Sequence, residues 1–385
     1  MTAIHYVGTC DHTGYGTAAR RMLHGLKNAG APFSWTPMVP GKAWGLGYQP
    51  AGRGACDPDF DVFRRAAAPC DTLLLHLVPE YALRWRRLEP DKRLVLYTTW
   101  ETNLLPRHWR FFLELADLVL VPSTWNKEVF DRAGLRVPVE VLPHIAAEAR
   151  TPEGPPPVRI EREDFVFLAI DSWTTRKRLR SLIACFLDTF SSQDPVTLVV
   201  KTDARCFDRS SAMPWGPSTA AEVRALRRRH RNPARVSLLT GNLPEDDILR
   251  LHGRADCFVS LSSAEGWGMG PFDAAAFGTP VIATGFGGAL DYLTADNAYL
   301  VRCRMVPVEN ERGRPSFMPD QMWAEPDSIH AAQLMRHVLA NREEAAERGK
   351  RLQADVRERF GEAAVVGRLM RLLEAGTKER GTSAP

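Results

Sequence analysis

Residues 264–284 read AEGWGMGPFDAAAFGTPVIAT and carry the densest functional signal in the chain. An apolar run ends just before them at Leu261, and another begins at Pro280. Between the two runs, the stretch GWGMG leads into a helical pattern that contains Asp273. A strand, a glycine-rich loop, a helix and a further strand in this order are typical of a doubly wound α/β domain with a parallel sheet.

The same stretch is suited to binding an anionic ligand. Glycine lets the backbone approach a ligand closely, and a helix N-terminus offers unpaired N–H groups and the positive end of its dipole. Glu265 lies in the loop and Asp273 lies eight positions later in the helix. The two carboxylates can therefore bind opposite ends of one extended ligand, with Glu265 on sugar hydroxyls and Asp273 on a ribose.

Strands and helices alternate in the same way through the rest of the chain. Amphipathic spacing predicts helices at residues 17–29 and 124–133, with Ser123 as the N-cap of the second helix. Such alternation predicts parallel sheets covered by helices on both faces. Buried strands are expected at residues 3–8, 72–76, 94–98, 118–122, 139–142, 165–170, 196–200, 236–239, 257–261 and 280–283.

A chain of 385 residues is long enough for two hydrophobic cores. The polar, proline-rich residues 149–158 have the composition of a linker between them. We expect one doubly wound domain at residues 1–150 and another at 159–350, with ligands in the cleft between the two domains. Residues 351–375 are expected to form helices that cross back to the first domain, followed by a disordered tail at 376–385.

Residues 264–284 resemble the Glu-x7-Glu motif of retaining GT-B glycosyltransferases, specifically glycosyltransferase family four. The resemblance covers most of residues 160–302 and implies two Rossmann-like domains that face each other across a cleft. It implies a nucleoside diphosphate sugar as co-substrate, with no metal and no other cofactor. By this match Glu265 contacts the donor sugar, and Asp273 contacts the ribose at a position where the family usually has Glu. The backbone N–H groups of Met269 and Gly270 face the donor. The remaining donor-binding residues of this segment are the loop residues Gly266, Trp267 and Gly268.

A second match lies at residues 172–180, SWTTRKRLR, between a strand and a helix. Similar enzymes place an Arg and then a Lys here, where the cations neutralise the donor diphosphate. Lys177 fits the lysine and is expected to act in catalysis. The earlier position falls on Asp171 or Ser172, so Arg176 is the candidate second cation. Arg176, Arg178 and Arg180 also fit a solvated first turn of a helix, and we expect this to be their main role.

The first half of the chain resembles the family more loosely. Gly14 and Gly16, in the stretch DHTGYG after the first strand, resemble the glycine loop that faces the donor in GT-B enzymes. The stretch TTWET at residues 98–102 resembles a branch of family four. Candidate contacts to the acceptor or the sugar are Tyr15, Trp100, Glu101 and His144. Glu101 equally fits an acid at a helix N-terminus, and a lone His such as His144 is more often a hydrogen-bonded structural residue.

Composition excludes several classes of protein. The net charge is +4, which alone does not imply a polyanionic partner, although the basic stretch from Arg224 to Arg235 could contact an acidic surface. The seven scattered cysteines argue against a disulfide framework or a zinc site, and most of them are expected to be small buried residues. The sequence has no membrane-spanning run and no secretory signal pattern. We therefore expect a cytoplasmic protein, either free or peripheral to a membrane.

Three alternatives stay open at this point. An epimerase or hydrolase of the same fold would use the same donor pocket. An NAD-dependent oxidoreductase would need the full G-x-G-x-x-G pattern, but Gly14 and Gly16 are followed by Ala19. A nucleic-acid-directed glycosyltransferase or binder would depend on the basic stretch alone. The Asp57-Pro58-Asp59 sequence lacks the flanking strand that a metal-binding D-x-D requires, and it is expected to form a turn.

Overall fold

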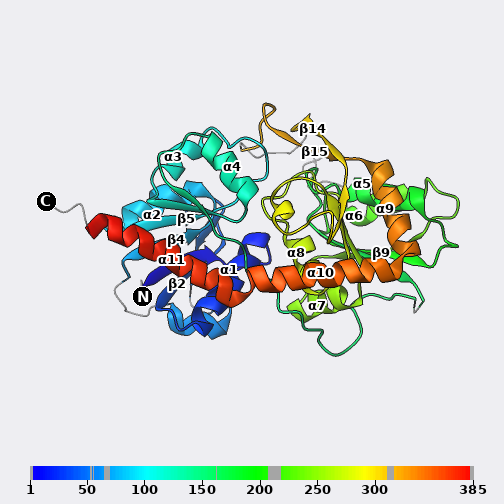
Figure 1. Cartoon of the computed structure of the whole chain (residues 1–385), viewed down its shortest axis with the longest axis horizontal. Helices are drawn as coiled ribbons and strands as arrows, with labels where there is room; N and C mark the ends of the chain where they lie inside the picture. The colour runs from blue at the N-terminus through cyan, green and yellow to red at the C-terminus, as the bar shows by residue number, and fades with distance from the viewer. Residues whose placement is uncertain are drawn as a thin grey trace. The chain divides into compact units, whose positions relative to one another are not determined.

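The computed structural model describes residues 3–52, 54, 56–64, 70–161, 163–206, 218–309 and 316–381. The chain divides into two compact units. Unit 1 contains Met1–Trp100, Leu104–Ala146 and Glu358–Pro385, and unit 2 contains Glu101–Asn103 and Ala147–Arg357. Residues 142–164, which include the expected linker at 149–158, form no helix or strand over their described part. Figure 1 shows the two units, with the α-helices and some of the strands labelled.

Unit 1 is built on a seven-stranded sheet in the order β3-β2-β1-β4-β5-β6-β7. Neighbouring strands are parallel except for the antiparallel edge pair β2 and β3. The central strands are buried on both faces, which explains their unbroken runs of Leu and Val. The strands are β1 (Ile4–Thr9), β2 (Phe33–Pro40), β3 (Tyr48–Pro50), β4 (Thr72–His76), β5 (Arg93–Tyr97), β6 (Leu118–Val121) and β7 (Val139–Val141).

The helices of unit 1 connect and cover these strands. Ser123 caps α4 through a hydrogen bond from the Asn126 N–H, as the sequence predicts. Asp57 accepts a hydrogen bond from the Asp59 N–H and caps η1, so the Asp57-Pro58-Asp59 stretch begins a short 3-10 helix rather than the expected turn. The helices are α1 (Gly14–Asn28), η1 (Pro58–Phe63), η2 (Pro79–Tyr81), α2 (Ala82–Leu88), α3 (Trp109–Leu113) and α4 (Thr124–Arg132).

Helix α1 begins three residues earlier than its spacing pattern predicts. Thr13 caps the helix by accepting a hydrogen bond from the Gly16 N–H, so Gly14 and Gly16 lie in the first turn and not in a loop before it. A Cβ atom on Gly16 would lie 2.1 Å from the Asp11 carbonyl oxygen. Gly16 therefore allows the chain after β1 to fold tightly over the start of the helix.

The C-terminal part of the chain returns to unit 1. Helix α10 (Arg342–Phe360) starts in unit 2, and α11 (Glu362–Gly381) belongs to unit 1. Val365, Val366, Leu369 and Leu373 of α11 are buried in the core formed around β1, β4 and α1. The helix continues to Gly381, which is further than the sequence pattern predicts. Residues 382–385 of the expected tail lie outside the described residues.

A disulfide joins Cys10 to Cys56, across a separation of 46 residues. The expectation that the cysteines are free is therefore wrong for this pair. The two positions are distant in sequence and come together only when the chain after β1 packs near η1, so their spacing gave no signal. Cys70, Cys185, Cys206 and Cys257 are buried and form no disulfide, as expected for small apolar residues.

Unit 2 is built on a second parallel sheet, in the order β10-β9-β8-β11-β12-β13. The prediction of two doubly wound α/β domains is confirmed. Phe167, Trp173, Phe186 and Phe258 are among its largest fully buried side chains. The strands are β8 (Phe165–Ile170), β9 (Val196–Thr202), β10 (Arg235–Thr240), β11 (Cys257–Ser260), β12 (Val281–Thr284) and β13 (Tyr299–Val301).

The helices and a hairpin complete unit 2. The hairpin of β14 (Cys303–Pro307) and β15 (Met322–Pro326) is antiparallel, and neither strand was among those expected from the sequence. Residues 310–315 between its strands are outside the described residues. The helices are α5 (Leu179–Thr189), α6 (Thr219–Arg227), α7 (Glu245–Arg254), α8 (Met269–Ala276), η3 (Gly288–Asp291) and α9 (Ser328–Ala340).

Candidate functional site

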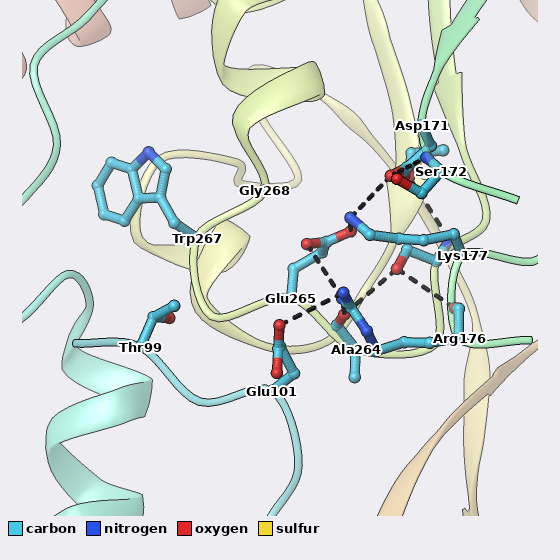
Figure 2. Close-up of polar contacts among 12 residues, drawn as sticks. Thr99, Glu101, Asp171, Ser172, Arg176, Lys177, Ala264, Glu265, Trp267 and Gly268 are labelled. Carbon is cyan, nitrogen blue, oxygen red and sulfur yellow. Dashed lines mark hydrogen bonds and ion pairs between the residues drawn. The ribbon is translucent and has the colours of Figure 1, made fainter. Parts of the chain in front are cut away.

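Two loops of unit 2 leave neighbouring strands at the same edge of its sheet. β8 and β11 are paired in parallel, so residues 171–178 after β8 and residues 261–268 after β11 meet. The Ser263 N–H donates to the Arg176 carbonyl oxygen at 2.8 Å, which joins the two loops through the backbone. Figure 2 shows the side chains that this meeting brings together. The carboxyl ends of parallel strands are the usual location of ligand sites in such sheets.

Lys177 lies between two carboxylates at the centre of the site. Its Nζ atom is 2.6 Å from Oε1 of Glu265 and 2.9 Å from Oδ1 of Asp171 (Figure 2). The three side chains are 14–17% exposed, so water screens these charges only weakly. A lysine ammonium has three N–H donors, and the two contacts use two of them. The third can donate to a ligand oxygen.

Arg176 is also part of this cluster. Its Nη1 atom donates to the Ala264 carbonyl oxygen at 2.7 Å and lies 3.6 Å from Oε2 of Glu265, and its Nη2 atom lies 3.3 Å from Oε1 of Glu101. Arg176 is buried, with 9% of its surface exposed. The expectation that it lies in a solvated first turn is therefore wrong. Burial against two acids, with the planar guanidinium held at both ends, fixes the cation in one orientation.

The charges in the cluster shift the pKa values of its members. Burial raises the pKa of Asp171 to about 6, and the nearby Glu265 carboxylate adds to this rise despite the opposing effect of Lys177. Burial also acts to raise the pKa of Glu265, but Lys177 and Arg176 outweigh it and hold that pKa below its usual value. The two acids raise the pKa of Lys177 against the effect of burial. Glu265 and Lys177 are therefore charged at neutral pH, and Asp171 is the group that titrates near it.

The backbone around Glu265 is fixed by a further glycine pair. The Gly288 N–H donates to the Glu265 carbonyl oxygen at 2.8 Å. Gly287 has φ +89°, and a Cβ atom there would lie 2.6 Å from the same oxygen. Only glycine accommodates both the left-handed backbone and this close approach. The carboxylate of Glu265 is therefore carried by a rigid segment.

The N-terminus of α8 opens next to this cluster. Gly268 precedes the helix with φ +86°, and no side chain caps the first turn. Gly270 packs against the end of β8, where an added Cβ would lie 3.2 Å from the Ile170 carbonyl oxygen. The N–H groups of Met269 and Gly270 belong to the first turn of α8, whereas Pro271 has no N–H to offer. Two cations and a helix N-terminus thus lie near the same strand end, an arrangement that suits a diphosphate.

The other predicted donor residues have different surroundings. The Trp267 indole is 3% exposed and packs against Phe272 and Tyr292, with ring centroids 5.0 and 5.2 Å away. Its ring points away from the charged cluster (Figure 2), so only its backbone can contribute, as for Gly266 and Gly268. Asp273 is partly exposed and lies one helical turn after Met269.

The predicted residues of unit 1 are held by hydrogen bonds within that unit. The Tyr15 hydroxyl bonds to Thr98 Oγ1 at 3.0 Å and accepts from the Thr99 N–H at 3.0 Å. The Trp100 indole N–H donates to the Leu104 carbonyl oxygen at 2.7 Å. His144 is 7% exposed, and its Nδ1 lies 2.7 Å from the Tyr97 hydroxyl. Burial lowers the pKa of His144 to about 3, so its ring is neutral.

Two members of the cluster were not among the predicted donor residues. Asp171 directly follows β8 and faces Lys177, and an acid just after a strand, six positions before the lysine, is the signal that could have identified it. Glu101 was predicted as a contact to the acceptor or the sugar, and its ion-pair partner Arg176 lies 75 residues later in the chain. Asn103 from the same short segment accepts a hydrogen bond from the Met322 N–H through Oδ1, which further joins residues 101–103 to unit 2. Nothing in the sequence indicates these pairings.

Other predicted features can be placed in the described parts of the chain. The described residues contain no group of three or more His, Cys, Asp or Glu side chains arranged to hold a metal ion. None of the described helices has the length and hydropathy needed to cross a bilayer. In the basic stretch, Arg235 lies in β10 and pairs with Asp164 at 2.5 Å. The exposed arginines are Arg224, Arg227, Arg228, Arg229 and Arg231.

Solved structures match both units of the chain together. Sucrose-phosphate synthase from Thermosynechococcus elongatus matches with a TM-score of 0.68 at 16% identity, over 97% of this chain and 100% of that chain. Anabaena HepE in complex with UDP-glucose matches with a TM-score of 0.66 at 15% identity, over 97% and 100%. A glycosyltransferase from Rickettsia africae matches with a TM-score of 0.66 at 13% identity, over 98% and 99%.

The chain has the GT-B fold. Within this GT-B chain, residues 155–305 match the family described as Glycosyl transferases group 1. The matched segment contains Asp171, Arg176, Lys177 and Glu265, together with all of α8. No curated protein matches the chain in sequence. Four members of the charged cluster therefore lie inside the segment that matches this family, whereas Glu101 lies outside it.

Proposed function

We propose that this protein is a glycosyltransferase that moves a sugar from a nucleoside diphosphate sugar to an acceptor hydroxyl or amine, with retention of anomeric configuration. The observation that carries the proposal is the buried cluster of Lys177, Arg176 and Glu265 beside the N-terminus of α8. The cluster lies in the glycosyltransferase group 1 domain. The Glu-x7-Glu type of motif supports the assignment to family four and to the retaining class.

In this proposal the protein acts mainly by orientation and charge stabilisation. Lys177 and Arg176 neutralise the diphosphate and the charge that develops on it as the glycosidic bond breaks. The Met269 and Gly270 N–H groups bind phosphate oxygens, Glu265 accepts hydrogen bonds from the sugar hydroxyls, and Asp273 contacts the ribose. The nucleotide sugar is the co-substrate, and no metal or separate cofactor takes part.

Donor binding is tested first, with a panel of nucleoside diphosphates and their sugars. A ligand at one hundred times its Kd stabilises the folded protein by about 2.7 kcal/mol, so one base should produce a clear rise in Tm. The rise should persist in EDTA and disappear in Lys177→Ala. A flat panel for every nucleotide, or stabilisation by NAD(H) alone, would contradict the proposal.

The product then separates transfer from its same-fold alternatives. With the donor identified, NMR of the anomeric proton reports the configuration of the transferred sugar, which should match that of the donor. Release of free sugar in the presence of acceptors would indicate a hydrolase. Conversion of the donor to an isomeric sugar nucleotide would indicate an epimerase. Stabilisation by DNA or RNA that depends on the exposed arginines between Arg224 and Arg231 would favour a nucleic-acid-directed enzyme.

Donor affinity should depend on pH through Asp171. The charged groups that face Asp171 are Lys177, Glu265 and Arg176. Within this cluster only Asp171 titrates near neutral pH, with a pKa of about 6. A bound diphosphate adds negative charge and raises the Asp171 pKa further, so binding takes up a proton. Affinity for the sugar nucleotide should therefore fall roughly three- to tenfold from pH 6 to pH 8, since each pKa unit corresponds to about 1.36 kcal/mol.

Asp171→Asn removes this titration and provides the matched comparison. The variant should bind the sugar nucleotide with nearly the same affinity at both pH values, and more tightly than the original protein at pH 8. Calorimetry in two buffers of different ionisation enthalpy should also show proton uptake in the original protein only. Equal affinity at pH 6 and pH 8 in the original protein, or tighter binding at pH 8, would rule out this linkage.

A further inference from the structure

A cavity of unit 2 lies among the first turns of α5 and α9 and the hairpin of β14 and β15. Its volume is about 680 Å³. Arg178 and Ser181 come from the start of α5, and Ile329 comes from α9. Arg304 belongs to β14, and Arg302 lies just before this strand. The elements around it are labelled together in Figure 1. None of these residues belongs to the cluster around Lys177 and Glu265.

The backbone at Arg178 separates this cavity from the proposed donor site. Among the described non-glycine residues, Arg178 alone has a positive φ, of +52°. Such a conformation costs about 1–3 kcal/mol and persists only when its surroundings hold it. The Arg178 Nε atom donates to Ser263 Oγ at 2.6 Å, which provides that hold. As a result, Arg176 and Lys177 contact Glu265, whereas the side chain of Arg178 lines this cavity.

The cavity carries an excess of positive charge. Glu325 and Asp327 are its acidic residues, against three arginines. Glu325 lies 3.8 Å from Arg178 Nη1 and 2.5 Å from Arg304 Nη2, and Asp327 lies 3.1 Å from Arg302 Nη2. Arg302 and Arg304 are 68% and 79% exposed, and ion pairs so exposed are worth only about 0–1 kcal/mol. An anion that enters the cavity can therefore take over these guanidinium groups at little cost.

Two further features indicate the kind of ligand. The first turn of α5 has no side-chain cap and no acidic residue, so its N–H groups add to the attraction for an anion beside Ser181. Ile329 is 71% exposed at the edge of the cavity, and the buried Leu261 also lines it. Cys303 is not a reactive thiol here, because burial raises its pKa. The lining thus combines guanidinium groups with apolar surface.

We propose that this cavity is a second binding site, for a small anionic ligand that has a phosphate monoester or a carboxylate on an apolar body. Planar guanidinium groups bind the oxygens of either anion in a bidentate manner. The apolar body covers Ile329 and removes it from water. The proposal does not depend on the glycosyl transfer reaction, because the donor cations and this cavity use different side chains.

The test uses calorimetry on the full chain with phenyl phosphate, benzoate and inorganic phosphate as probes. The double variant Arg302→Ala/Arg304→Ala should weaken binding of the preferred aromatic probe at least about tenfold, or about 1.4 kcal/mol. The control Arg227→Ala/Arg228→Ala removes the same charge from exposed positions near the end of α6 and should change binding less than about twofold. Lys177→Ala should leave binding of this probe intact.

The probes also identify the anion. Tighter binding of phenyl phosphate than of benzoate assigns a phosphate monoester, and the reverse assigns a carboxylate. Either aromatic probe should bind more tightly than inorganic phosphate, and Ile329→Ser should remove that advantage. The proposal is overturned if neither aromatic probe binds, if the control double variant loses binding equally, or if Lys177→Ala alone abolishes binding. Because nucleotide binding should survive in Arg302→Ala/Arg304→Ala, a failure of this proposal is distinguishable from a failure of the donor site.

Discussion

Glu265→Gln should lower kcat/KM roughly 10²- to 10³-fold, the usual effect of removing a charged group that acts in the transition state. Glutamine has almost the same shape but no charge, so Lys177 and Arg176 lose the acid that orients both of them. It also replaces one acceptor oxygen by a donor at the expected position of the sugar hydroxyls. The rate should be measured with saturating acceptor and varied donor.

The loss should come from chemistry and sugar positioning rather than from unfolding. Glu222→Gln is a matched control, because Glu222 also pairs with an arginine of unit 2, Arg180, at 3.3 Å on the surface. That variant should retain activity within about twofold, since exposed pairs contribute little. If Glu265→Gln retained activity within about threefold of the original protein, the assignment of Glu265 would be wrong.

Lys177→Ala should have the second large effect, on stability as well as on activity. It removes the ammonium that lies between the two buried carboxylates of Asp171 and Glu265. Breaking a buried pair typically costs about 3–5 kcal/mol, and protonation of Asp171 should reduce this cost to roughly 2–3 kcal/mol near pH 7. Urea unfolding at pH 7 measures the change, and donor binding should be lost in the same variant.

A second substitution separates the two effects of Lys177→Ala. In Asp171→Asn/Lys177→Ala one negative charge is removed together with the cation, so most of the lost stability should return. Donor binding should not return, because the phosphate-binding cation is still missing. If the double variant recovered both stability and donor affinity, Lys177 would be only a structural partner of the acids. If Lys177→Ala were as stable as the original protein, the buried ion-pair network would be wrong.

The sequence predicts much of this site because its key residues lie in two short local segments. Glycines, a helix start and an acid within residues 264–273 constrain each other through the chain itself, and Lys177 follows a clear strand. The ion pair of Arg176 with Glu101 depends instead on tertiary packing of residues 101–103 against the loops after β8 and β11. No local sequence pattern predicts it. For the same reason, Arg176 resembles its solvated neighbour Arg180 in sequence although it is buried.

The fold is likewise predicted where hydrophobic runs are long and uninterrupted. β4 and β8 have the expected bounds because they are central strands with mainly apolar and almost entirely buried side chains. β2 was missed because it contains Pro37 and Pro40, which normally argue against a strand. β14 is mostly exposed, so it lacks the apolar run that marks a buried strand. The Cys10–Cys56 disulfide depends on tertiary contact alone.

The return of α11 to unit 1 has a consequence for how the chain folds during synthesis. Val366 fits against Gly25 of α1, where an added Cβ would lie 2.7 Å away, and the Leu373 carbonyl oxygen accepts a hydrogen bond from the buried Arg93 guanidinium. The two partners in each pair are separated by more than 270 residues in the sequence. Unit 1 is therefore synthesised first, but it can complete its fold only after the C-terminal helix has been made. Nearly the whole chain must leave the ribosome before Arg93 can donate its hydrogen bond to the Leu373 carbonyl oxygen. Expression of residues 1–146 alone therefore leaves an open apolar face on α1, and a gene divided between the two units does not yield two independent folding modules.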